Sequence, residues 1–83
     1  VRLVVEGNDR RGLLSDIATA ITQTGTNIQS AGIRAVEGGM HGHFVVEVQD
    51  LAHLTKVMKA IRRVNGVLSV ERREQVVEAE ADE

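Results

Sequence analysis

Apolar and polar positions follow two different periods along this chain. Runs with alternating or β-branched residues predict four strands, at residues 1–6, 27–36, 43–49 and 67–72. Apolar positions three and four residues apart predict two helices. The first helix has the apolar stripe Leu14, Ile17, Ala18 and Ile21. The second has the stripe Leu54, Val57, Met58 and Ile61. The predicted element order is therefore βαββαβ.

Capping and turn residues separate these elements. Asp9 and Asp50 each precede a predicted helix, and we expect both carboxylates to cap it. Gly25 is expected to end the first helix in a left-handed conformation, and Asn65-Gly66 to end the second. Glu37-Gly38-Gly39 predicts a turn between the second and third strands.

The two halves of the chain resemble each other. VVE at 4–6, with Asp9 three residues on, matches VVE at 45–47 followed by Asp50, and LLSDIATAI overlays HLTKVMKAI. Two βαβ halves joined by a hairpin predict an α+β, ferredoxin-like fold. This fold places a four-stranded antiparallel sheet under two helices on one face. The alternation slips at Ala31-Gly32, where we expect a β-bulge.

The other face of the sheet has no predicted cover within this chain. On the first strand, Arg2, Val4 and Glu6 face the opposite way to Leu3 and Val5. A half-apolar open face with free strand edges predicts a homodimer or higher oligomer. The alternative is a monomer whose open face is polar enough to stay in water.

Composition narrows the class of protein. The chain has 83 residues, 42% of them hydrophobic, and no cysteine, so disulfides and thiolate chemistry are excluded. No apolar run approaches the roughly 20 residues that span a bilayer, and no signal peptide is visible. We expect a cytoplasmic protein without a membrane partner. Because the chain opens on Val1, we expect a piece of a longer protein.

Charge divides the chain into a body and a tail. The net charge is −2, yet the last ten residues, EQVVEAEADE, hold five acidic residues and no basic one. Residues 1–73 hold ten Lys and Arg against seven Asp and Glu. We therefore predict one domain at 1–73 and an acidic C-terminal tail at 74–83.

Catalysis by this segment alone is not expected. Ser15, Ser30 and Ser69 lack a glycine-flanked elbow or a local base, and the acidic residues form no inward pair. His41 and His43 point the same way if extended, but two imidazoles without a third ligand favour a solvated hairpin over a metal site. We expect no metal and no cofactor. His53 follows a helix cap and is expected to be exposed.

RNA recognition remains open at one place. RNA-recognition motifs stack bases on sheet aromatics, whereas the single aromatic residue here, Phe44, alternates with the core set. Sheet-face stacking is therefore disfavoured. A basic strip on the second helix is either a solvated face or a contact for RNA or an acidic partner. Its residues are Lys56, Lys59, Arg62 and Arg63.

The junction NDRRGLL, at 8–14, is the candidate ligand site. Free N–H groups at the start of a helix would hold an anion such as an amino-acid carboxylate. Gly12 would let a ligand or a second copy reach the main chain, Asn8 or Asp9 would take an amino group, and Leu13 and Leu14 would contact its side chain. The alternative is an ordinary tight turn with an Asp cap and a packing glycine.

These residues resemble the ACT domain, a family of small regulatory modules. The resemblance rests on DRRGLL at the first junction and GTNI before the second strand, and it covers residues 1–73. The strings VEGNDRRGLLSDIATAI and VNGVLSVER look most like the C-terminal ACT domain of RelA/SpoT-type proteins, which make and degrade (p)ppGpp.

The resemblance implies a regulatory segment whose synthetase and hydrolase sites lie in other domains. It implies a ligand between two copies, at Asn8, Asp9, Gly12, Leu13 and Leu14, with Asn27 and Ile28 near the same interface. Related proteins bind branched-chain amino acids or contact the ribosome through this region. Many ACT domains carry proline where this chain has Arg11, which leaves the identity of the ligand open.

Three functions follow as hypotheses. The first is a dimeric domain that senses a small, branched-chain amino acid for a (p)ppGpp synthetase/hydrolase. The second is a module that docks on ribosomal RNA or protein and binds no metabolite. The third is a free-standing ACT protein or a regulatory subunit of an amino-acid biosynthetic enzyme.

Overall fold

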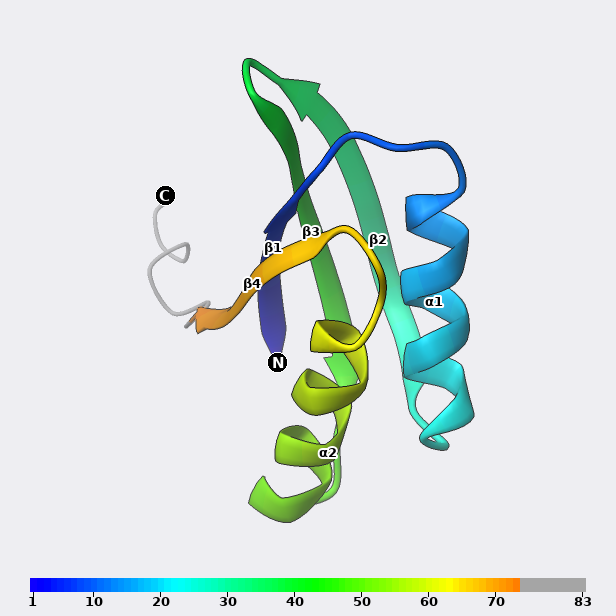
Figure 1. Cartoon of the computed structure of the whole chain (residues 1–83). Helices are drawn as coiled ribbons and strands as arrows, with labels where there is room; N and C mark the ends of the chain where they lie inside the picture. The colour runs from blue at the N-terminus through cyan, green and yellow to red at the C-terminus, as the bar shows by residue number, and fades with distance from the viewer. Residues whose placement is uncertain (74–83) are drawn as a thin grey trace, which may run out of the picture.

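The computed structural model describes residues 1–73 and confirms the predicted βαββαβ order (Figure 1). The strands are β1 Arg2–Gly7, β2 Asn27–Val36, β3 Gly39–Glu47 and β4 Val67–Arg73. The helices are α1 Leu13–Gln23 and α2 Leu51–Arg62. The third strand begins and ends earlier than the predicted 43–49. The acidic tail predicted at 74–83 lies outside the described residues.

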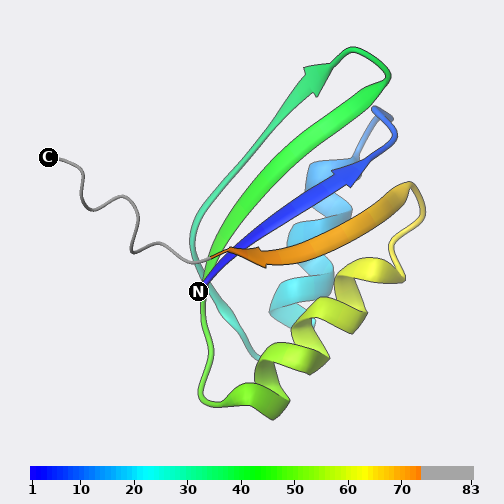
Figure 2. The ribbon, with the colours of Figure 1, turned by 90° about the vertical axis from the view of Figure 1, so that its left-hand side faces the viewer.

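The sheet is antiparallel, with strand order β2-β3-β1-β4, so β2 and β4 are its edges. Both helices cover one face, and the described part of the chain leaves the other face open (Figure 2). This arrangement confirms the ferredoxin-like prediction. No helix within residues 1–73 is long and apolar enough to cross a membrane.

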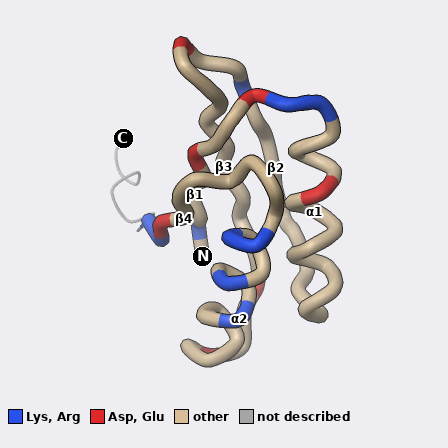
Figure 3. The backbone as a smooth tube through the Cα atoms, viewed as in Figure 1, with Lys and Arg blue, Asp and Glu red and all other residues tan. Residues whose placement is uncertain are grey.

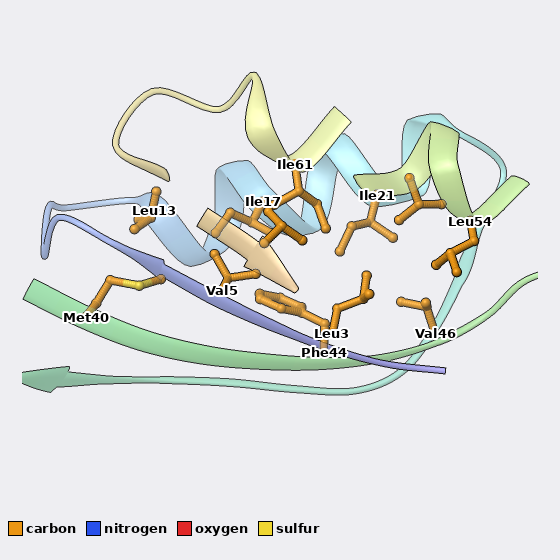
Figure 4. Close-up of a cluster of buried hydrophobic side chains, with 12 residues drawn as sticks. Leu3, Val5, Leu13, Ile17, Ile21, Met40, Phe44, Val46, Leu54 and Ile61 are labelled. Carbon is orange, nitrogen blue, oxygen red and sulfur yellow. The ribbon is translucent and has the colours of Figure 1, made fainter. Parts of the chain in front are cut away.

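The core lies between the sheet and the helices (Figure 4). Phe44 and Leu3 from the sheet and Ile17 from α1 are each 0% exposed. Burying each such side chain contributes about 1.5–3 kcal/mol of hydrophobic free energy. The prediction that Leu14 joins this core is wrong, since it is 40% exposed and Leu13 is buried instead. Residues 13, 17 and 21 lie four apart, and this spacing keeps all three on one helix face.

The predicted bulge at Ala31-Gly32 is also misplaced. The register between β2 and β3 shifts between Ile28 and Ser30, which leaves Gln29 without a Cα partner. Gly32 stays in register opposite His43, and a Cβ built on Gly32 would lie 2.9 Å from His43 Cε1. The glycine thus breaks the apolar alternation because an imidazole ring occupies the space above it.

The predicted end of the first helix is confirmed, because Gly25 has φ 80° directly after Thr24, the C-cap of α1. The prediction for the second helix is wrong: α2 ends at Arg62, with Arg63 as a right-handed C-cap. Asn65-Gly66 belongs to the turn that follows, in which the Val67 amide donates to the Val64 carbonyl. At the start of α2, Asp50 is the predicted cap, because its Oδ1 accepts a hydrogen bond from the His53 amide at 2.8 Å.

Candidate functional site

The junction between β1 and α1 is a tight turn that ends on glycine. Gly12 is the N-cap of α1, with φ 79° and ψ 3°, and the Leu13 amide donates to the Arg10 carbonyl at 3.3 Å. These values are those of the third residue of a type II turn, which requires positive φ. Backbone conformation therefore explains Gly12. The nearest atom to a Cβ built there is Arg10 Nη1 at 4.0 Å, so the space above it is open.

The prediction that Asp9 caps α1 is wrong. No side chain caps this helix, and the Asp16 amide donates to the Gly12 carbonyl at 2.9 Å. The amides of Leu14 and Ser15 have no hydrogen-bond partner among residues 1–73. Two free N–H groups therefore remain at the positive end of the helix dipole.

A cavity of about 400 Å³ opens beside these amides. It is lined by Asp9, Arg10, Gly12, Leu13, Leu14, Ser15, Ile33 and Met40. The structure thus brings together four of the predicted ligand residues: Asp9, Gly12, Leu13 and Leu14. The other four lining residues were not predicted, and two of them come from the hairpin that β2 and β3 form.

The remaining predicted residues do not line this cavity within one chain. Asn8 uses its amide to bond the Gly66 carbonyl at 2.8 Å, which ties the junction to the loop after α2. Asn27 and Ile28 begin β2 and therefore lie at the other end of α1 from Gly12.

Arg10 is the residue that organises this junction. Its Nε donates to the Asn65 carbonyl at 2.7 Å, and its Nη1 donates to the Arg11 carbonyl at 3.0 Å. Its Nη2 donates to Asp16 Oδ2 at 2.7 Å and forms an ion pair there. The guanidinium therefore links the turn, the first turn of α1 and the loop after α2 while lining the cavity.

The basic strip lies on α2 and on Arg63 directly after it, and Figure 3 colours the Lys and Arg positions blue. Lys56, Lys59, Arg62 and Arg63 are all exposed. No ion pair joins any of these four residues to the rest of residues 1–73, and α2 itself contains no acidic residue. The strip is therefore an uncompensated positive surface.

The three histidines have different surroundings. The expected exposure of His53 is wrong, because it is half-buried and hydrogen-bonded on both ring nitrogens. Its Nδ1 accepts from the Gln49 amide at 3.1 Å, and Nε2 lies 2.8 Å from Thr26 Oγ1. His41 Nδ1 lies 3.8 Å from Glu6 Oε2. Within residues 1–73, no group of three metal-ligating side chains is present.

The family of this chain follows from sequence comparison as well as from the fold. The model of the ACT domain family matches residues 1–72, so the chain belongs to the ACT domain family. The resemblance inferred from DRRGLL and GTNI is thereby confirmed.

The relatives are large proteins of guanosine nucleotide metabolism. The guanosine-3′,5′-bis(diphosphate) 3′-pyrophosphohydrolase of Aquifex aeolicus is 46% identical over 63 residues, which are 76% of this chain and 9% of that protein. The GTP pyrophosphokinase of Myxococcus xanthus is 42% identical over 73 residues, or 87% of this chain and 10% of that protein. This chain thus spans about a tenth of the length of these relatives.

A solved structure agrees with both findings. The ACT domain from the GTP pyrophosphokinase of Chlorobium tepidum superposes with a TM-score of 0.75 at 29% identity. The match covers 87% of this chain and 94% of that chain. The relatives in sequence and this neighbour in structure therefore share the name of a guanosine-nucleotide enzyme.

Proposed function

We propose that this ACT domain binds a small apolar amino acid at the first junction and regulates a (p)ppGpp synthetase/hydrolase of which it is one part. The observation that carries the proposal is the cavity beside the free amides of Leu14 and Ser15. The parent activity is carried over from the relatives, which are named for making guanosine nucleotides or hydrolysing guanosine 3′,5′-bis(diphosphate).

The lining of the cavity matches the three parts of an amino acid. The amides of Leu14 and Ser15 and the guanidinium of Arg10 suit a carboxylate, because all three are donors at a positive helix end. The carboxylate of Asp9 suits the ammonium group. The apolar residues of the lining, Leu13, Leu14, Ile33 and Met40, suit a hydrocarbon side chain. A volume of about 400 Å³ is large enough for a branched-chain amino acid.

Dimerisation through the edge of β2 would complete this site. β2 spans ten residues, Asn27–Val36, with Arg34 as its one charged residue. The opposite edge, β4, contains three charged residues, Glu71, Arg72 and Arg73. Both edge strands have a register shift, so the difference lies in their charge. Charged residues protect an edge strand from association, so β2 is the edge that favours pairing.

Antiparallel pairing of two β2 strands would bring the start of one beside the end of the other. Asn27 and Ile28 of the second copy would then approach the end of β2, and Ile33, which lines the cavity, lies in that part of the strand. Ligand binding between copies would favour the paired arrangement by the difference in its affinity for the two states. The catalytic domains of the parent would respond to that shift.

Amino-acid titration followed by NMR tests the ligand. Valine and isoleucine are expected to shift the amide signals of Leu14 and Ser15, while lysine and glutamate leave them unchanged. Asp9→Asn is expected to weaken valine binding about tenfold, since it removes the charge partner of the ammonium group. Glu37→Gln removes the same charge from a residue that does not line the cavity, and it serves as the control. Absence of shifts with any branched-chain amino acid at millimolar concentration contradicts the proposal.

Sedimentation equilibrium tests the dimer. Ala31 is exposed near the middle of β2, so Ala31→Asp places two like charges close to the proposed two-fold axis. We expect this variant to be monomeric, whereas Leu68→Asp on β4 leaves association unchanged. Equal effects of the two variants contradict pairing through β2.

Docking on RNA or an acidic partner is the second candidate function. The observation that favours it is the uncompensated positive surface of α2 (Figure 3). Reversing the charge of Lys56, Lys59 and Arg63 is expected to weaken ribosome binding by the parent protein and to leave valine binding intact. Unchanged ribosome binding contradicts this function.

A further inference from the structure

The face of the sheet that the helices leave uncovered contains a hollow, which is separate from the cavity at the first junction. Its volume is about 640 Å³, and it is lined by Arg2, Val4, Gly32, Ile33, Arg34, His41, His43 and Arg73. Five of these eight side chains are arginine or histidine. The amino-acid site proposed above uses none of the five.

The register of the strands places the positive groups at two ends of this hollow. Arg2 is the Cα partner of Arg73, so two guanidinium groups leave neighbouring strands on the same face. Directly opposed like charges are unfavourable unless an anion lies between them. At the other end, Arg34 is the Cα partner of His41.

A flat surface separates these two ends. His43 is paired with Val4 on one side and with Gly32 on the other. Its ring lies over Gly32, because a Cβ built on that glycine would be 2.9 Å from His43 Cε1. An imidazole beside an apolar floor is a surface on which a nucleobase stacks.

The acidic residues of this face lie beside basic or polar side chains. Glu71 lies 3.4 Å from Arg73, and Glu6 Oε2 lies 3.8 Å from His41 Nδ1, which is an ion pair only when the imidazole is protonated. Glu47 accepts hydrogen bonds from the side chains of Asn27 and Gln29 at 3.3 Å and 2.6 Å.

Two of the arginines, by contrast, are uncompensated. Arg2 and Arg34 have no hydrogen bond or ion pair from their side chains to any of residues 1–73. The hollow therefore presents one unpaired guanidinium near each end. Such a pair of cations suits a ligand with two separate anionic groups.

We propose that this hollow binds guanosine 3′,5′-bis(diphosphate), with one diphosphate at Arg2 and Arg73 and the other at Arg34. The choice of this nucleotide rests on the proposed parent activity, whereas the need for two separate anionic groups rests on the arginines. Glu6, His41 and Arg34 are side by side across the sheet, because His41 is the Cα partner of both other residues. Arg2 lies four residues before Glu6 on β1, so the two ends of the hollow are about 13 Å apart along the strands. An arginine guanidinium can donate two parallel hydrogen bonds to two oxygens of one phosphate group.

In the parent protein this hollow would sense the nucleotide, while the junction cavity senses the amino acid. The two sites lie on opposite sides of β2, and Ile33 lines both of them. The concentration of the nucleotide and the concentration of the amino acid would thus both act on β2.

Calorimetric titration of the 83-residue chain tests the proposal. Guanosine 3′,5′-bis(diphosphate) is expected to bind at least tenfold more tightly than GDP or inorganic pyrophosphate, which each fill only one end. Arg34→Gln is expected to weaken binding about tenfold. Arg63→Gln, directly after α2, removes the same charge from the helical layer and is expected to change the affinity less than twofold. NMR shifts are expected at Val4, Gly32 and His43.

Absence of binding at millimolar guanosine 3′,5′-bis(diphosphate) would overturn the proposal, and so would binding of GDP or pyrophosphate with the same affinity as this nucleotide. Weakening by Arg63→Gln equal to that by Arg34→Gln would overturn it as well. NMR shifts confined to Leu14 and Ser15 would also contradict it. If a single-stranded oligoribonucleotide binds more tightly than guanosine 3′,5′-bis(diphosphate), RNA and not this nucleotide is the ligand of the hollow. Failure of the valine titration leaves this test unaffected. Nucleotide binding without valine binding would retain the hollow and remove the amino-acid site.

Discussion

The two junctions between strand and helix differ although their sequences are similar: a side chain caps α2, whereas α1 begins at an open junction, one without a side-chain cap. At the start of α2, Asp50 binds the amide of His53 with its carboxylate and the amide of Leu54 with its carbonyl. At the start of α1, Gly12 offers only its carbonyl, and the amides of Leu14 and Ser15 have no partner within residues 1–73. The amides of Leu51 and Ala52 at the start of α2 likewise have none among these residues. The junctions therefore differ in the side-chain cap and in the glycine turn, and not in the number of free amides.

Loop length explains the difference. Only residues 48–50 separate β3 from α2, so Asp50 is the residue directly before the helix. Residues 8–12 separate β1 from α1, so Asp9 stands four positions before Leu13. A capping side chain reaches amides only within the next two or three residues. The two additional residues of the first loop therefore keep Asp9 from capping α1, and its side chain lines the cavity instead.

The largest expected effect is that of Gly12→Ala, which attacks the open junction directly. Alanine at φ 79° is strained, so we expect the free energy of unfolding to fall by about 1–2 kcal/mol in urea titrations. Gly12→Asn serves as the control, because asparagine tolerates this conformation and should recover part of the loss. Full stability of the alanine variant would mean that the turn has another conformation.

The two aspartates allow a direct comparison of the junctions. Asp50→Ala removes a side-chain cap, and we expect it to lower the free energy of unfolding by about 1 kcal/mol. Asp9→Ala removes no hydrogen bond that the described residues show, so we expect a change near zero. Thermal and urea unfolding of both variants measure the difference. Equal losses would show that Asp9 caps α1 in solution.

Arg10→Met tests what holds the open junction in place. The variant loses three hydrogen bonds but keeps much of the side-chain length, and we expect a loss of roughly 0.5–1 kcal/mol, because the group is partly exposed. Hydrogen exchange at the Asn8 amide, which bonds Gly66, should become faster. Arg11→Met is the matched control, and its exchange rate at Asn8 should equal that of the unchanged chain.

Arg11→Pro gives the smallest effect and the opposite sign. Arg11 is the second residue of the type II turn, a position where proline is common, and its amide donates no hydrogen bond within residues 1–73. We expect stability to rise by about 0.5 kcal/mol through a less flexible unfolded chain. Gln49→Pro at the other junction removes an amide that binds His53 and should lower stability. A loss with Arg11→Pro would contradict the assigned turn.

The fold was predictable because its signals are local. Alternation in the strands, helical spacing around Ile17 and Val57, and the glycines after both helices each act within a few residues. The open junction depended on contacts that no local pattern contains. Arg10 bonds Asn65, which lies 55 residues away, and Ile33 and Met40 reach the cavity from the hairpin. The prediction that Asp9 caps α1 was wrong because it relied on the VVE sequence that the two halves share. This shared sequence does not determine the length of the loop that follows it.

The pairing of β1 with β4 also determines how the domain would respond to mechanical load. Arg2 and Arg73 are Cα partners, so the two ends of the described chain leave the sheet side by side. A pull on both ends would therefore load the backbone bonds of this pair singly and in sequence, as in a zipper. Shear geometry, which loads many bonds at once, is absent from this pair. Tension from neighbouring parts of a longer protein would peel β4 from the edge at low force.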